Sequence, residues 1–170
     1  MAASLGGRSG IVEHEPKEID MKFEIPRPMK IEHEELHGML RKATKEPGEI
    51  GEAAIAVAKL MHPHFIKEEE YALPPLGLLR SLAEGKVTPE MAEVLALTDK
   101  LKAELPQMLA EHKLIVAALE KLSTAAEKAG RMEYVDFSKA LMLHAQTEEE
   151  VAYPTSIIVG EFVREKLRSR

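Results

Sequence analysis

Two segments of the sequence repeat one pattern of potential metal ligands. His64 is followed four residues later by Glu68, and His144 is followed four residues later by Glu148. In each segment two more glutamates come next, and a proline closes the segment. Imidazole and carboxylate groups with this spacing lie one turn apart on one face of a helix, so they can bind the same ion or bridge two ions. The repeat therefore indicates metal chemistry carried by helices.

A further histidine precedes each segment at a similar distance. His33 lies 31 residues before His64, and His112 lies 32 residues before His144. On a helical wheel of about 100° per residue, each of these four histidines falls on an apolar face. Burying histidines and carboxylates in an apolar interior is unfavourable unless they are paired or bind a metal ion. Inward groups from four helices can meet at the centre of a bundle, so we expect a metal site there.

The spacing of histidine and glutamate is not specific by itself, because the chain has 26 glutamates and seven histidines. His14 and Glu18 have the same spacing in the polar N-terminal part, where we expect His14 to face solvent. Chance does not explain two copies with matching flanks on apolar faces. On the wheel His62 points away from His64, so it is not expected to be a ligand. The remaining glutamates of the two segments are interpreted as solvent-facing: Glu69, Glu70, Glu149 and Glu150.

The periodicity of apolar residues predicts an all-α protein. Residues 1–28 have no helical period and are predicted to form an extended leader. Residues 29–170 are predicted to form one domain, an up-and-down antiparallel four-helix bundle with a short extra helix after the second helix. Prolines and glycines set the expected boundaries. The predicted helices span 29–44, 47–73, 76–84, 89–130 and 133 to the C-terminus, with a kink at Pro106 and a bend at Pro154.

The composition narrows the classes of function. The chain of 170 residues is 45% hydrophobic and 4% aromatic, which favours helices over sheets. It has no cysteine, so thiolate metal sites, iron-sulfur clusters and disulfides are excluded. The net charge of −6, without a basic stripe, argues against a nucleic acid partner. Neither a signal sequence nor a segment of membrane-spanning length is recognised, so a cytoplasmic location away from membranes is expected.

The order of these ligands resembles the HHE pattern of the hemerythrin-like family. The matching residues lie between Ile31 and Pro154 and comprise His33, His64 with Glu68, His112, and His144 with Glu148. The resemblance implies two non-haem iron ions joined by an oxo or hydroxo group, with Glu68 and Glu148 bridging them. Glu149 is a rival to Glu148, because the corresponding hemerythrin carboxylate lies five residues after its histidine. Ferritin-like proteins are a poorer match, since they use a Glu-x-x-His order.

His37, one turn after His33, is a further candidate ligand. With it the histidines would number five, as in the hemerythrins that carry dioxygen. One iron would take His33, His37 and His64, whereas the other would take His112 and His144 and keep a position open for a small ligand. The alternative is that His37 is buried without contacting metal, or only supports a ligand.

The residues around the expected site suggest a small apolar pocket. Its predicted walls are Leu40, Ile115, Val116 and Leu119, with Val116 in the place that corresponds to His37. The wheel turns Tyr71 of the first segment and Val151 of the second inward. Tyr71 is expected either to pack with its hydroxyl hydrogen-bonded or to contact the metal.

These features predict a di-iron protein that binds dioxygen or a similar small diatomic ligand for carriage, storage or sensing. No acid or base beyond the ligands is evident, so binding is favoured over catalysis. One alternative is a di-iron enzyme acting on peroxide or nitric oxide. Another is an iron donor in iron-sulfur repair, which the lack of cysteine disfavours. A metal-free interaction bundle ranks last.

Overall fold

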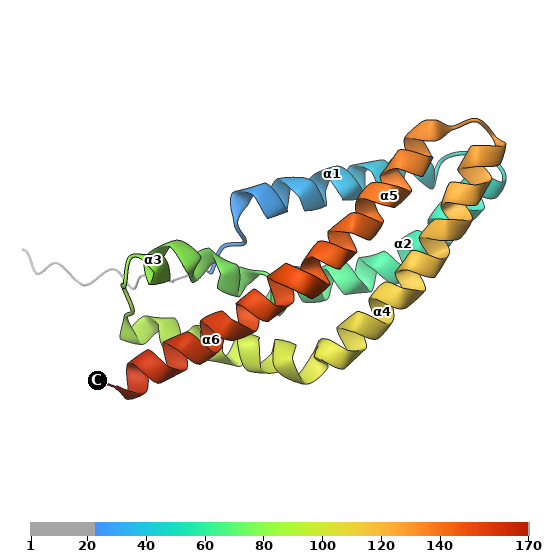
Figure 1. Ribbon diagram of the computed structural model, residues 1–170. Coiled ribbons are helices and arrows are strands. Elements are labelled where there is room, and N and C mark those ends of the chain that lie inside the picture. Colours follow the sequence, from blue (N-terminus) through green and yellow to red (C-terminus); the bar gives the residue numbers. More distant parts are fainter. Residues whose placement is uncertain (1–22, 170) are drawn as a thin grey trace, which may run out of the picture.

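Prolines and glycines begin the helices of this chain, which a computed structural model describes for residues 23–169 (Figure 1). α1 (Arg27–Ala43) begins after Pro26. α2 (Glu49–Lys67) follows Gly48, whose φ of 68° is a conformation that favours glycine. α4 (Val94–Lys128) and α5 (Met132–Thr147) are joined through Gly130, which has the same φ. α6 (Tyr153–Arg168) extends α5 and has a proline in its first turn.

The four principal helices pack antiparallel, so the predicted all-α four-helix bundle is confirmed (Figure 1). They are α1, α2, α4 and the α5–α6 pair. A 3-10 turn (Pro74–Leu78) and the short helix α3 (Leu79–Ala83) follow the second principal helix, where a short helix was predicted. Another 3-10 turn (Pro89–Glu93) leads into α4. α4 is visibly bent in Figure 1 and contains Pro106, which cannot donate a helical hydrogen bond.

The predicted leader is described only in its last part. Residues 1–22, including His14, lie outside the described residues. Residues 23–26 have no regular secondary structure, and α1 begins two residues before the predicted start of the bundle. Phe23 packs against the apolar cluster of α4 and α6, while Ile25 packs against Leu73 and Leu76. The described part of the leader is therefore held against the bundle.

Both copies of the repeat contain one turn of π-helix, at Glu68–Ala72 and at Glu148–Ala152. In the first, the backbone N–H of Leu73 donates to the carbonyl of Glu68, five residues earlier, at 2.9 Å. In the second, the N–H of Tyr153 donates to the carbonyl of Glu148. A proline follows each turn, and its ring would clash with the carbonyl four residues before it in a regular α-helix. The wider turn relieves this clash, and such turns are frequent at functional sites.

The π-turn changes which side chains face inward. Val151 was predicted to face the interior, but 58% of its surface is exposed, so that prediction was wrong. The helical wheel assumes about 100° per residue, which the extra residue of a π-turn changes for the residues that follow. The turn alone does not explain the exposure of Val151, because Tyr71, the equivalent residue of the first π-turn, is buried. Tyr153, at the end of the turn, is completely buried instead. Leu73, its counterpart in the first copy, is buried as well.

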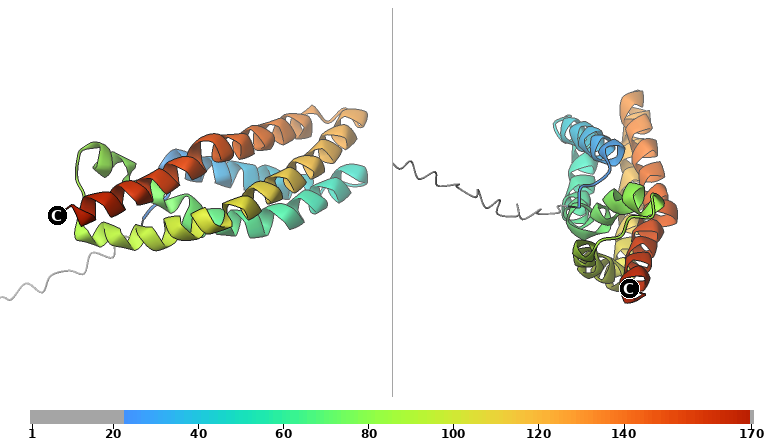
Figure 2. Two further views of the ribbon diagram at one scale, coloured as in Figure 1. Left: turned by 60° about the horizontal axis from the view of Figure 1, so that its bottom comes forward. Right: turned by 90° about the vertical axis from the view of Figure 1, so that its left-hand side faces the viewer.

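Apolar layers lie along the bundle on either side of the inward histidines. One layer is formed by α1, α2, α5 and the C-terminal half of α4. The other contains Tyr71, Leu101, Met108 and Tyr153. Figure 2 shows that α6, which leads to the C-terminus, runs beside the first part of α4. Within residues 23–169, none of the helices combines the length and the apolar character needed to span a membrane.

The contact between α4 and α6 depends on a glycine. Gly160 of α6 lies against the buried Thr98 of α4. A β-carbon added at Gly160 would be 2.1 Å from Thr98 Oγ1 and 2.6 Å from Thr98 Cβ. Real atoms do not approach so closely, so the two helices could not keep this separation with any larger residue.

Gly160→Ala is therefore expected to destabilise the protein by about 1–3 kcal/mol through overpacking. Gly38→Ala is the matched control, because a β-carbon at Gly38 would meet nothing within 4 Å. The control should be neutral or more stable by about 0.5–1 kcal/mol, since alanine is the better helix former. Chemical denaturation followed by circular dichroism measures both. Equal stability of the two variants would contradict the close α4–α6 contact.

Candidate metal centre

Six of the seven residues predicted as ligands meet in the middle of the bundle. The histidines come from the four principal helices, and the two glutamates begin the two π-turns. Every one of these side chains is at least 97% buried. Imidazole nitrogens and carboxylate oxygens of the set form two groups, each compact enough to hold a metal ion. The set comprises His33, His64, Glu68, His112, His144 and Glu148.

The first group contains His64, Glu68, His112 and Glu148. The Nε2 atoms of His64 and His112 face each other at 2.7 Å. Glu68 Oε1 lies 3.0 Å from His64 Nε2, and Glu148 Oε2 lies 3.5 Å from His112 Nε2. Two imidazoles and two carboxylates thus present their donor atoms to one point.

The second group contains His33, His144 and Glu148. The Nε2 atoms of the two histidines are 3.1 Å apart, and Glu148 Oε1 lies 3.1 Å from His144 and 3.4 Å from His33. Glu148 therefore presents one oxygen to each group. Glu68 Oε2 lies 3.9 Å from His33 Nε2 and is buried without a hydrogen-bond partner within the described residues. An unpartnered buried carboxylate oxygen is unfavourable, and a cation between the groups would satisfy it.

The histidines divide between the groups differently from the prediction. His33 and His64 were expected to share one ion, and His112 and His144 the other. Instead His64 pairs with His112, and His33 pairs with His144. The prediction grouped histidines by their half of the sequence, whereas the packing of α2 against α4 and of α1 against α5 decides which rings meet.

Each of the four inward histidines has a glutamate of another helix or turn beside its outer nitrogen, Nδ1. Glu111 lies 2.8 Å from the Nδ1 of His64, and Glu149 lies 3.0 Å from that of His112. The corresponding distances are 3.3 Å from Glu32 to His144 and 3.7 Å from Glu69 to His33. Carboxylates placed in this way orient metal-binding imidazoles and raise their basicity. Glu111 and Glu149 therefore hold the rings of His64 and His112 by hydrogen bonds, whereas Glu32 and Glu69 are charged neighbours of His144 and His33.

The solvent-facing interpretation of the repeat holds for Glu69 but only partly for Glu149. Glu69 is exposed and still lies 3.7 Å from the Nδ1 of His33, whereas Glu149 is partly buried and contacts the Nδ1 of His112 at 3.0 Å. The sequence carried a signal, because Glu69 and Glu149 occupy equivalent places 80 residues apart, as do Glu32 and Glu111 at 79. Of the rivals Glu148 and Glu149, only Glu148 belongs to the two groups.

The outer glutamates fix the protons of the histidines. Burial would raise the pKa of Glu111, but His64 and Lys67 outweigh it and lower this pKa to about 2, so Glu111 is ionised. An ionised carboxylate accepts a hydrogen bond, which places a proton on Nδ1 and leaves a lone pair on Nε2 of a neutral imidazole. The Nε2 atoms of His64 and His112 lie 2.7 Å apart, so a proton or a metal ion between them is needed to offset the repulsion of two lone pairs. A metal ion between them removes the repulsion, so the donor set fits a metal.

The inner carboxylates favour positive charge at the same place. Burial opposes protonation of His112 and His144, yet hydrogen bonds with Glu148 raise the pKa of His112 to about 10 and that of His144 to about 9. Burial likewise opposes ionisation of Glu148, but the surrounding histidines hold its pKa well below the ordinary value. The interior thus stabilises a cation, either protons or metal ions.

His37, the seventh predicted ligand, lies outside both groups. It is half-buried, and its ring packs against Phe65 with centroids 4.1 Å apart. Burial lowers its pKa. A ligand role for His37 therefore stays a prediction, because His37 belongs to neither group. His62 is exposed, as the helical wheel indicates.

The predicted pocket residues are mostly part of the core. Leu40, Ile115 and Leu119 are buried in the apolar layer formed by α1, α2, α4 and α5, whereas Val116 is half-buried. Tyr71 is buried, and its hydroxyl donates to Glu104 at 2.7 Å. Of the two interpretations of Tyr71, packing with a hydrogen-bonded hydroxyl is the one observed.

Tyr153 is the residue of this site that sequence reasoning missed. Its hydroxyl donates to Glu68 Oε1 at 2.5 Å and lies 3.4 Å from His64 Nε2 and 3.3 Å from His112 Nε2. Burial and the nearby carboxylates Glu68 and Glu148 raise the pKa of this phenol. Only the sequence difference between the two copies, Tyr153 against Leu73, could have drawn attention to it.

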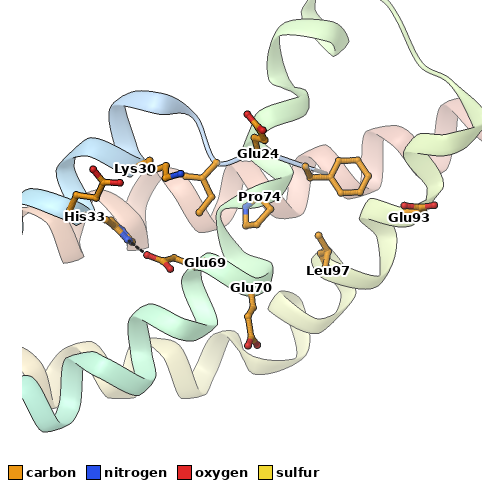
Figure 3. A pocket seen from close by; sticks show the side chains of 11 residues that line it. Glu24, Lys30, His33, Glu69, Glu70, Pro74, Glu93 and Leu97 are labelled. Atoms are coloured by element: carbon orange, nitrogen blue, oxygen red, sulfur yellow. Dashed lines mark ion pairs between the residues drawn. The ribbon is translucent and has the colours of Figure 1, made fainter. Parts of the chain in front are cut away.

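An open pocket of about 770 Å³ lies beside the second group (Figure 3). His33 lines it, and Figure 3 shows His33 and Glu69 pointing toward one another at its edge. The pocket carries five glutamates and one lysine, so its field attracts cations and repels anions. Its charged lining residues are Glu24, Lys30, Glu34, Glu69, Glu70 and Glu93.

No protein-family model matches the chain, and neither the curated proteins nor the solved structures gave a match. The observations therefore establish a helical bundle with two buried groups of histidine and glutamate that could hold metal ions and that share Glu148.

Glu149→Gln should weaken metal binding, because an amide next to Nδ1 is a poorer acceptor and no longer fixes the His112 imidazole. The expected loss of affinity is about 10–100-fold. It is measured by anaerobic titration with ferrous iron against a competing chelator. Glu150→Gln is the matched control, since Glu150 is exposed and its side chain contacts Gln146 rather than a histidine. Equal affinities of the two variants would contradict the supporting role of Glu149.

Proposed function

We propose that this protein is a hemerythrin-like di-iron protein that binds dioxygen or a similar small diatomic ligand. The observation that carries the proposal is the pair of adjacent donor groups that share Glu148 and face each other across the bundle. Each group offers two imidazole nitrogens and at least one carboxylate oxygen. The order of the donors along the chain is the one that resembles the hemerythrin-like family.

The type of donor favours iron. The chain has no cysteine, so sites that require thiolate ligands do not apply. Mixed imidazole and carboxylate ligands suit ferrous iron, and neither group has enough protein donors to complete an octahedral ion, so positions remain for exogenous ligands. In this proposal His64, His112 and Glu68 would hold one ion, His33 and His144 would hold the other, and Glu148 would offer one oxygen to each. When bound, the two ferrous ions would supply one electron each to dioxygen.

The surroundings favour a small uncharged ligand. Apolar layers on both sides of the donor groups exclude water from the interior. The acidic pocket beside His33 repels anions, whereas a neutral diatomic molecule meets no such barrier. The same negative field would concentrate ferrous ions near the second group. Carboxylates beside the outer nitrogens help to keep the imidazoles in place, so that the donor groups keep their positions as ligands enter and leave. These carboxylates belong to Glu32, Glu69, Glu111 and Glu149.

Anaerobically prepared protein should contain about two irons per chain, one for each group. Admission of air should produce a visible charge-transfer band that disappears on deoxygenation, because the ligand is held reversibly. Metal analysis and absorption spectra taken under nitrogen and then air measure these outcomes. Zinc alone, or no metal, would overturn the proposal. Sustained consumption of peroxide or nitric oxide by the iron-loaded protein would show an enzyme instead.

Two variants make this test specific. Glu148→Ala should lose both ions, because this carboxylate is the only residue common to the two groups. His37→Ala is the matched control, since it removes a half-buried inward residue outside the groups and should leave two ions. Loss of iron from the His37 variant would instead make His37 a ligand, as the sequence suggested.

A further inference from the structure

The two donor groups differ in one phenol. The polar contacts of His33 and His144 are with glutamates and with each other. In contrast, the hydroxyl oxygen of Tyr153 lies 3.4 Å from His64 Nε2 and 3.3 Å from His112 Nε2. The same oxygen is 2.5 Å from Glu68 Oε1. Tyr153 therefore sits among the donor atoms of the first group.

These distances are those of atoms that share an ion. Donors that lie about 2.0–2.2 Å from one ion are about 2.8–3.6 Å from each other at octahedral or tetrahedral angles. The distances from the phenol oxygen to both imidazole nitrogens fall within this range. The 2.5 Å distance to Glu68 is that of a short hydrogen bond, with the phenol proton between two oxygens. A cation at this point would occupy the place toward which the phenol, the carboxylate and both imidazoles are directed.

We propose that Tyr153 is a ligand of the ion held by His64, His112 and Glu68, and that it makes the two ions of the centre unequal. The inference rests on the proposed di-iron centre and specifies its ligands further. The oxygen of Tyr153 binds as a phenolate, and its proton is released to solvent as the metal–oxygen bond forms. The position is fixed by the π-turn, which brings Tyr153 inward at the end of the second copy.

A Tyr153 ligand at the first ion decides which of the two ions is open to the small ligand. The first group then has four residues in addition to Glu148 available at its ion, namely both imidazoles, Glu68 and the phenolate. The second group has only His33, His144 and Glu148. The ion of the second group keeps more open positions, and it lies beside the pocket that His33 lines. We assign the exogenous ligand to this second ion.

Tyr71 is a natural control for Tyr153. Both phenols are buried, and both donate to a glutamate. The hydroxyl of Tyr71, however, contacts Glu104 and the sulfur of Met108 rather than any residue of the two groups. Phenylalanine at either position removes one hydroxyl and leaves the ring.

The test uses the full chain loaded anaerobically with ferrous iron and then oxidised by ferricyanide, which takes one electron from each ion. Ferric phenolate gives a visible charge-transfer band and enhanced phenolate vibrations in the resonance Raman spectrum. The wild type and Tyr71→Phe should show both signals. Tyr153→Phe should lose both while retaining about two irons per chain. Two irons without phenolate signals in the wild type would overturn the inference and leave the proposed function intact, as would signals that persist in Tyr153→Phe.

A second variant protects the test against a folding failure. The chain has three tyrosines, so Tyr71→Phe combined with Tyr134→Phe leaves Tyr153 alone. With ring-deuterated tyrosine, this double variant should show phenolate bands that shift with the isotope. Absence of the shift with two irons bound would contradict a Tyr153 ligand. A wild type that takes up no iron would overturn both the inference and the proposed function.

Discussion

The structure depends on burying four imidazoles whose free nitrogens point at one another. Carboxylates lie beside the outer Nδ1 atoms, and the Nε2 atoms of His64 and His112 face each other at 2.7 Å and those of His33 and His144 at 3.1 Å. In a water-excluded interior this arrangement is unfavourable unless positive charge lies between the nitrogens. Glu68 and Glu148 bring negative charge to the same place. A metal pair would satisfy all of these groups together, and the apolar layers of the bundle hold them in place.

The internal repeat builds the centre, and departures from the repeat differentiate its halves. Glutamates at equivalent places support equivalent histidines, which gives the centre an approximate two-fold relation. The π-turn is also present in both copies, because both end in proline. The turn delivers Tyr153 to the first group, but its counterpart is Leu73. The symmetry is thus broken at a position that the helical wheel did not place near the site.

The sequence predicted the helices and the inward donors because both follow from local periodicity. The i, i+4 spacing identified Glu68 and Glu148, and prolines and glycines marked the helix ends. The sequence could not predict which histidines pair, since that depends on which helices are neighbours. It also failed at Val151, which is exposed although its equivalent Tyr71 is buried, and it missed Tyr153, which follows a turn with one extra residue. The contacts of Glu69 and Glu149 cross between helices, so only the repeat hinted at them.

The central claim is that the inward nitrogens and carboxylates hold two ions that share Glu148. Crystals of the anaerobically iron-loaded protein, with anomalous diffraction measured at the iron absorption edge, test it most directly. Two anomalous peaks are expected, one beside the Nε2 atoms of His64 and His112 and one beside those of His33 and His144. A single peak, or peaks confined to the acidic pocket at the surface, would contradict it.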